Sequence, residues 1–193
     1  LGVDVNARVV ETVSHGDIHI EEPGLRTMVK AGVHSGQLRA STMLESADTY
    51  IIAVPTPCVT HREDHRSSDL QAVEGAVEAL LQVLGKGELV ILESTSPPET
   101  TRKLVANRLE EAGFEVGKDV FVAHCPERVL PGNIMRELTH NDRIIGGITA
   151  ECARRAAKLY ESFVEGEIHL TDATTAELAK LMENTYRDVN IAL

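Results

Sequence analysis

The chain has 193 residues, of which 42% are hydrophobic and 25% are charged, so one large domain, or one domain and part of another, can bury a core. The formal net charge of −11 argues against nucleic-acid binding through a broad basic face. The three widely spaced cysteines form neither a disulfide framework nor a metal-ligand set, and no apolar run has the length of a membrane span. We therefore expect a cytoplasmic protein with no metal site, membrane contact or nucleic-acid partner.

Short β-branched runs alternate with amphipathic stretches in the first half of the chain. "LGVDV" predicts a strand that ends at Asp4, followed by a helix over residues 6–14 and a weak strand over 38–42. "TYIIAVP" at 49–55 predicts a strong buried strand that is closed by a Pro-Thr-Pro turn. A helix over 69–84 and a strand in "ELVILESTS" at 88–96 follow.

The stretch "SPPE" predicts the start of the next helix. Ser96 has the position of an N-cap, Pro97 that of the first helical residue, and Glu99 follows the cap by three residues. This spacing is that of a capping box, and it predicts a helix that reaches about residue 112.

The second half continues the alternation. Strands are expected in "DVFVAHCP", at 142–148 and at 167–172, with a helix over 150–165 and a final helix from Ala173 onward. Strands that alternate with helices of this length predict an α/β fold, a Rossmann-like doubly wound parallel sheet with helices on both faces.

Polar residues follow four of the predicted strands, at Asp4, 55–57, 93–96 and 125–128. Ligands of open parallel sheets bind at the carboxyl ends of the strands, so these segments form one candidate site. Asp4 suits either the ribose hydroxyls of a dinucleotide or a simple turn. "STSPPE" suits either an anion at a helix N-terminus or a capped helix without a ligand, and Thr95 is its free hydroxyl.

Lys180 and Asn184 are four residues apart and share a helix face. They suit stabilisation of an oxyanion, or they form a solvated stripe on an amphipathic helix. His124 and Cys125 are adjacent in a strand and point to opposite sides, so they do not form a catalytic dyad.

Taken together, the stretches "GVDVN", "GDIHIEEPGL", "IIAVPTP", "VILESTSPP", "CPERVLPGNIMREL", "NDRIIGGI" and "TAELAKLMENTYRDVNIAL" resemble the UDP-glucose/GDP-mannose family of nucleotide-sugar 6-dehydrogenases, in the order of the family and over nearly the whole chain. Glu127 matches the first glutamate of the family's P-E-F-L-x-E-G turn, and Pro131 stands in place of the second. This form of the turn is typical of members that act on UDP-N-acetyl-D-mannosamine.

The resemblance implies an NAD-dependent enzyme that oxidises the sugar 6-hydroxyl of UDP-N-acetyl-D-mannosamine to the uronate. Two hydride transfers proceed through a thioester on a cysteine. UDP-N-acetylglucosamine and UDP-glucose are the alternative substrates, and a non-catalytic dimerising module is the alternative of another class. The resemblance also implies roles for the residues at matching positions. The catalytic residues would be Lys180, Asn184, Glu127 and Thr95, and the cofactor-binding residues would be Asp4, Val54, Pro55, Thr56, Ser94 and Thr95. The substrate-binding residues would be Glu127, Arg128, Val129, Lys180, Asn184 and Arg187.

The same resemblance predicts the domain organisation. Residues 1–172 correspond to an NAD-binding domain and residues 173–193 to the start of a central helical domain through which members commonly dimerise. No G-x-G-x-x-G occurs, and none of the cysteines has the family's G-x-C context, so we expect the glycine-rich loop before residue 1, and the catalytic cysteine and the UDP-binding domain after residue 193. We expect a homodimer or larger homo-oligomer, and no activity from these 193 residues alone.

Overall fold

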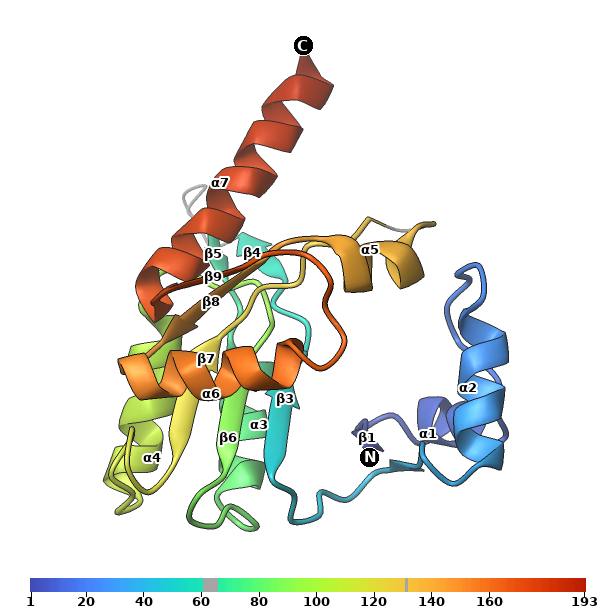
Figure 1. Cartoon of the computed structure of the whole chain (residues 1–193), viewed down its shortest axis with the longest axis horizontal. Helices are drawn as coiled ribbons and strands as arrows, with labels where there is room; N and C mark the ends of the chain where they lie inside the picture. Colours follow the sequence, from blue (N-terminus) through green and yellow to red (C-terminus); the bar gives the residue numbers. More distant parts are fainter. Residues whose placement is uncertain (61–65, 131) are drawn as a thin grey trace. The chain divides into compact units, whose positions relative to one another are not determined.

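The structure, a computed structural model, describes residues 1–60, 66–130 and 132–193. The chain forms two compact units (Figure 1). The first comprises Leu1–Glu45 and Val129–His140, and the second comprises Ser46–Arg128 and Asn141–Leu193. Among the described residues, no helix has both the length and the apolar character that crossing a bilayer requires.

The first unit contains a parallel pair of short strands and three described helices. These elements are β1 (Gly2–Val3), paired with β2 (Ala40–Ser41), and α1 (Ala7–Ser14), α2 (Leu25–His34) and α5 (Ile134–His140). The Asn6 side chain caps α1 by accepting a hydrogen bond from the Arg8 N–H at 3.0 Å. The sequence patterns that we used predicted α1 and missed α2 and α5.

The second unit contains a five-stranded sheet in the order β3-β6-β7-β8-β9. Its strands are β3 (Thr49–Ile52), β6 (Leu89–Leu92), β7 (Phe121–His124), β8 (Arg143–Gly147) and β9 (Ile168–Asp172). Its helices are α3 (Gln71–Leu80), the π-helical turn η1 (Thr101–Ala106) that continues into α4 (Asn107–Glu111), α6 (Ala150–Tyr160) and α7 (Ala173–Ala192). An antiparallel pair, β4 (Cys58–Thr60) with β5 (Arg66–Ser68), follows β3 and was not predicted.

The sheet is parallel except at one pair of strands. β3, β6 and β7 run parallel, as do β8 and β9, whereas β7 and β8 are antiparallel, with Ala123 opposite Gly147. The predicted Rossmann-like parallel sheet is therefore confirmed, and its one antiparallel pair, β7 with β8, was not predicted. The segment that connects β7 and β8 includes residues 129–140, which belong to the first unit.

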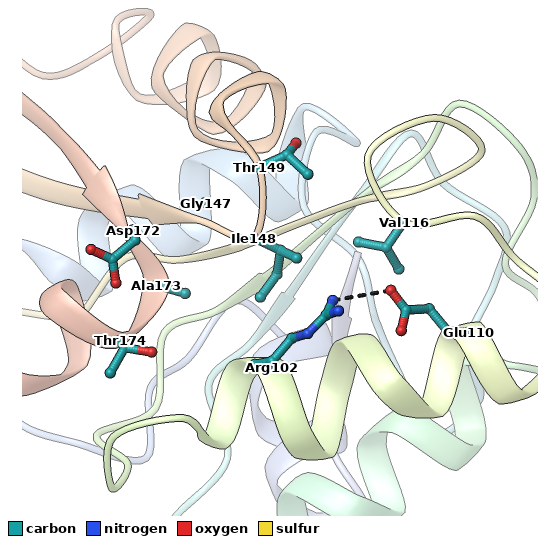
Figure 2. Close-up of a pocket in the computed structure, with 9 residues that line it drawn as sticks. All are labelled: Arg102, Glu110, Val116, Gly147, Ile148, Thr149, Asp172, Ala173 and Thr174. Atoms are coloured by element: carbon teal, nitrogen blue, oxygen red, sulfur yellow. Dashed lines mark hydrogen bonds and ion pairs between the residues drawn. The ribbon is translucent and has the colours of Figure 1, made fainter.

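Two adjacent glycines in β8 let helices approach the sheet closely from both faces. A Cβ atom on Gly146 would lie 2.6 Å from the Ala173 Cα and 2.7 Å from the Ala176 Cβ of α7. A Cβ atom on Gly147 would lie 2.9 Å from the Ala153 Cβ of α6. Figure 2 shows Gly147 between the segments that carry Thr149 and Asp172, where α6 and α7 begin.

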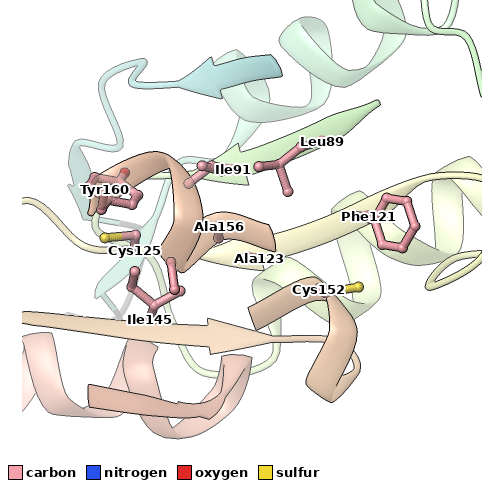
Figure 3. Close-up of a cluster of buried hydrophobic side chains, with 10 residues drawn as sticks. Leu89, Ile91, Phe121, Ala123, Cys125, Ile145, Cys152, Ala156 and Tyr160 are labelled. Carbon is pink, nitrogen blue, oxygen red and sulfur yellow. The ribbon is translucent and has the colours of Figure 1, made fainter. Parts of the chain in front are cut away.

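The core lies on both sides of the sheet, as the doubly wound pattern predicts. One buried cluster joins alternate residues of β6, β7 and β8 to α6 (Figure 3), and it contains Leu89, Ile91, Phe121, Ala123, Ile145, Cys152, Ala156 and Tyr160. The intervening strand residues point to the other face. There Val90, Leu92 and Val122 are fully buried, as are Val73, Val105 and Leu109 of α3, η1 and α4.

Candidate active site

Hydrogen bonds join the turns that follow β3 and β6. The Thr56 hydroxyl donates to the Thr95 carbonyl at 2.5 Å, and the Ser94 hydroxyl donates to the Val54 carbonyl at 2.7 Å. The structure therefore brings together four of the residues predicted to bind the cofactor, with Pro55 exposed beside them. The half-buried Thr95 side chain makes no hydrogen bond to another described residue, so its hydroxyl is available to a ligand.

The predicted capping box at Ser96 was wrong. The Ser96 hydroxyl is buried and has no hydrogen-bond partner within the described residues. Glu99 has a φ of 72°, in the left-handed region, so the two prolines before it do not begin the helix, which starts as a π turn at Thr101.

The free N–H groups at this helix start bind a carboxylate of the protein itself. Glu177 of α7 accepts hydrogen bonds from the Glu99 N–H at 2.5 Å, the Thr101 N–H at 2.7 Å and the Thr101 hydroxyl at 2.6 Å. The anion that the sequence suggested for this position is therefore Glu177, which lies 76 residues away along the chain from Thr101.

The turn after β7 contains Glu127 and Arg128 and is bound to α7. The Arg128 Nε donates to Glu183 at 2.8 Å, its Nη1 donates to the Asp142 carbonyl at 3.2 Å, and the Asn141 amide donates to the Arg128 carbonyl at 2.9 Å. Pro126 is buried and Glu127 is half-buried. Pro131, which the sequence comparison placed opposite a family glutamate, lies outside the described residues.

A buried polar cluster lies beside Glu127 and was not predicted. The Tyr160 hydroxyl donates to Glu93 at 3.4 Å, and the guanidinium of the buried Arg143 is 5.6 Å from the centre of the Tyr160 ring. Burial raises the pKa of Glu93, opposed by the positive charge of Arg143 and reinforced by the negative charge of Glu127. The carboxylates of Glu93 and Glu127 and the Arg143 guanidinium therefore act on one another electrostatically.

The polar face of α7 points inward. Glu177 and Lys180 are buried, Asn184 and Arg187 are half-buried, and all four lie on one side of the helix because they are three or four residues apart. Lys180 forms no ion pair or hydrogen bond with a described residue. Asn184 accepts a hydrogen bond from Arg187 at 3.0 Å through its carbonyl, which leaves its amide N–H groups to donate. The alternative of a solvated stripe does not describe these residues.

Asp4 and Val129 belong to the first unit. Asp4 follows β1, is half-buried and accepts a hydrogen bond from the Asn6 N–H at 2.7 Å. Because Asn6 caps α1, Asp4 is not needed as a cap and keeps further acceptor capacity on its carboxylate.

The hollow in Figure 2 has a volume of about 360 Å³ and lies beside the starts of α6, α7 and η1. Its wall includes Arg102 and Glu110, which form an ion pair at 3.0 Å. None of the residues predicted to bind cofactor or substrate lines it, so this hollow is separate from the predicted site.

Two of the cysteines, Cys125 and Cys152, and the histidine His124 are buried, which makes them poor nucleophiles and poor bases. Cys125 and Cys152 are fully buried, and burial raises the pKa of the Cys125 thiol to about 11. Burial also lowers the pKa of His124 to about 4, so this imidazole is neutral at physiological pH. No group of three metal-binding side chains occurs among the described residues.

The sheet, its cross-linked turns and the inward polar face of α7 define a Rossmann-like nucleotide-binding domain. The chain belongs to the UDP-glucose/GDP-mannose dehydrogenase family, and residues 1–164 match the NAD-binding domain of that family.

Named relatives agree with this assignment. The UDP-N-acetyl-D-mannosamine dehydrogenase of Methanococcus maripaludis is 50% identical over 193 residues, which cover 100% of this chain and 43% of the relative. The NDP-N-acetyl-D-galactosaminuronic acid dehydrogenase of Ralstonia nicotianae is 49% identical over 199 residues, covering 100% of this chain and 46% of the relative. The native structure of a UDP-N-acetyl-mannosamine dehydrogenase from Staphylococcus aureus superposes with a TM-score of 0.92 at 48% identity, over 99% of this chain and 46% of that one. The chain thus spans less than half the length of the curated relatives it matches.

Proposed function

We propose that the protein oxidises the C6 hydroxyl of UDP-N-acetyl-D-mannosamine to the carboxylate, with NAD⁺ as the hydride acceptor in two successive transfers. The observation that carries the proposal is Lys180, a buried lysine with no ion pair among the described residues, on a helix face that also presents the Asn184 amide. An ammonium group without a counter-ion on this face can stabilise negative charge that develops on a bound substrate.

Each residue of the proposed site has a role in the reaction that follows from its chemistry. Lys180 and the Asn184 amide stabilise the oxyanion that forms at C6, and Glu127 positions the sugar and activates the water that releases the acid. The Thr95 hydroxyl orients that water or the nicotinamide. Arg128, Val129 and Arg187 contact the sugar nucleotide, and the half-buried Arg128 is already held in place by Glu183.

The residues assigned to NAD⁺ fit that cofactor. The Asp4 carboxylate has acceptor capacity left for ribose hydroxyls, as the acid after the second strand of a dinucleotide fold requires. The Thr56 hydroxyl donates to the Thr95 carbonyl and the Ser94 hydroxyl donates to the Val54 carbonyl, so these residues shape the turns against the cofactor, and their hydroxyls remain free only as acceptors.

The thioester intermediate is assigned to a cysteine that is not part of this chain. A nucleophilic cysteine must be accessible and largely ionised, whereas Cys125 and Cys152 are fully buried. Cys58 is exposed at the start of β4 but lacks the family's sequence context. The 193 residues alone are therefore proposed to be inactive.

The test is a panel of sugar nucleotides offered with NAD⁺ to the full-length protein. We expect two equivalents of reduced cofactor for each UDP-N-acetyl-D-mannosamine, and slower turnover of UDP-N-acetylglucosamine and UDP-glucose. UDP-N-acetylgalactosamine belongs in the panel because the Ralstonia relative is nearly as similar to this chain. Lys180→Ala should lower kcat by about 10²–10³-fold, as loss of an oxyanion donor does. Turnover that survives this substitution unchanged would remove Lys180 from the mechanism.

We further propose that the protein is a homodimer in which the outer face of α7 packs against a second copy. This face is apolar and exposed, with Leu178 at 47%, Met182 at 64% and Tyr186 at 73% of their full exposure. A hollow of about 380 Å³ lies among these side chains, Leu181 and Thr185. Contiguous apolar surface of this kind is typical of protein interfaces.

A further inference from the structure

The Glu177 carboxylate is fully buried, and no ion pair accompanies it among the described residues. It accepts the three hydrogen bonds from Glu99 and Thr101, and every donor belongs to the segment that follows β6. Burial raises its pKa, and the three hydrogen bonds oppose that shift. The carboxylate thus joins α7 to this segment through three hydrogen bonds.

The contact joins the two segments that carry the proposed catalytic groups. Glu177 precedes Lys180 by three residues on the same helix face, and Glu99 follows Thr95 by four residues in the turn after β6. Only four residues of α7 are buried, namely Ala173, Ala176, Glu177 and Lys180, so the helix is fixed to the rest of the second unit mainly through its first two turns.

We propose that Glu177 is a positioning residue, which sets the rotation and height of α7 against the turn after β6 and thereby places the Lys180 ammonium relative to the Thr95 hydroxyl. The inference rests on the proposed function, in which these two groups act on the substrate. Glutamine has the same shape as glutamate but one acceptor oxygen fewer. Its amide N–H₂ group would therefore face either the Glu99 N–H or the two donors of Thr101, and α7 must shift to relieve the repulsion.

The experiment compares variants of the full-length protein in their reaction with NAD⁺ and UDP-N-acetyl-D-mannosamine. They are Glu177→Gln, Lys180→Ala, the double variant, and Asp172→Asn as the matched control. Asp172 is the exposed N-cap of the same helix and accepts from the Thr175 N–H at 2.9 Å and its hydroxyl at 2.6 Å. Its substitution weakens α7 and leaves the Glu177 contact intact.

We expect Glu177→Gln to lower kcat by about tenfold to a hundredfold, as a displacement of about 1 Å does, with the KM for NAD⁺ unchanged. In the Lys180→Ala background the same substitution should cost much less turnover than in the wild type, because Glu177 acts mainly through Lys180. Asp172→Asn should lower the melting temperature and leave kcat unchanged. Glu177→Asp, which keeps the charge on a shorter side chain, should recover part of the lost turnover, and it replaces Glu177→Gln if that variant does not fold.

Two results would overturn the inference: losses in kcat that multiply in the double variant, or an equal loss of kcat in Asp172→Asn. Either result leaves the proposed function standing, provided that the wild type turns over and Lys180→Ala turns over about 10²–10³-fold more slowly. A wild type that oxidises no sugar nucleotide, or a fully active Lys180→Ala variant, refutes the proposed function instead.

Discussion

Replacing Gly146 with alanine tests how tightly α7 is seated on the sheet. The new Cβ atom would meet the Asp172 carbonyl oxygen, the Ala173 Cα at 2.6 Å and the Ala176 Cβ at 2.7 Å. Two of these three atoms are backbone atoms, which cannot rotate away, so α7 itself must move. Overpacking of this kind costs about 1–3 kcal/mol, and the rigid neighbours place Gly146→Ala at about 3 kcal/mol. The corresponding fall in melting temperature is about 6–12 °C for a unit of this size.

The assay is thermal unfolding of the full-length protein together with its turnover of UDP-sugar. Gly75→Ala is the matched control, because Gly75 lies exposed inside α3 with nothing within 4 Å of an added Cβ. That variant should be more stable by about 0.5–1 kcal/mol, since alanine loses less conformational freedom in a helix. A Gly146→Ala protein that melts within about 2 °C of the wild type would show that α7 is not held as closely as the structure indicates.

Two further substitutions test the turn and the polar cluster at the carboxyl end of β6. Ser96→Ala should change the unfolding free energy little or raise it slightly, since the buried hydroxyl makes no hydrogen bond to a described residue; a loss of about 1 kcal/mol would instead support the capping role. Burial raises the pKa of Glu93 above its ordinary 4.5, with Arg143, Glu127 and Tyr160 around it, so its contribution to stability is complete below pH 4.5 and is lost as the pH rises through the folded-state pKa. Glu93→Gln should therefore reduce the fall in unfolding free energy between pH 4.5 and neutrality. The unfolding free energy is measured by urea titration at each pH, and a dependence on pH equal to that of the wild type would contradict this assignment.

Local sequence patterns predicted those elements whose cause is local. The buried runs of β3 and β6 and the apolar spacing of α3 were readable, because burial on a sheet or on one helix face leaves a period in the sequence. α2 also carries this signal, with Leu25, Val29 and Val33 at helical spacing. It could therefore have been found.

Other features depend on residues far apart in the chain. α5 begins where the Glu22 carboxylate, 112 residues before Ile134, accepts hydrogen bonds from the Gly132 and Ile134 N–H groups at 2.8 Å each. The helix after β6 is capped by Glu177 in the same way. Neither cap can be recognised from the residues next to the helix start. At Ser96 the neighbouring residues even predicted a capping box that does not form.

The candidate site likewise has features that the local sequence predicts and features that depend on tertiary packing. The residue types and their places at strand ends were visible in the sequence, since polar residues after apolar runs stand out. The rotation of α7 was not, because an amphipathic helix shows which residues share a face without showing which face is buried. Here the polar face is turned inward, and the apolar residues that a soluble helix would normally bury are exposed.

This reversal yields the last prediction, which concerns the proposed dimer. Met182 is 64% exposed at the centre of the apolar face of α7, so Met182→Asp would place a charge in an apolar interface and should convert the full-length protein to monomers in analytical ultracentrifugation. Met28 of α2, 58% exposed, provides the control, since Met28→Asp makes the same chemical change outside α7 and should leave the dimer intact. If Met182→Asp remains dimeric at the concentrations at which the wild type is dimeric, the contact between copies lies elsewhere. The exposed face of α7 would then have to be covered by another part of the same protein, since apolar surface of this extent is rarely left in water.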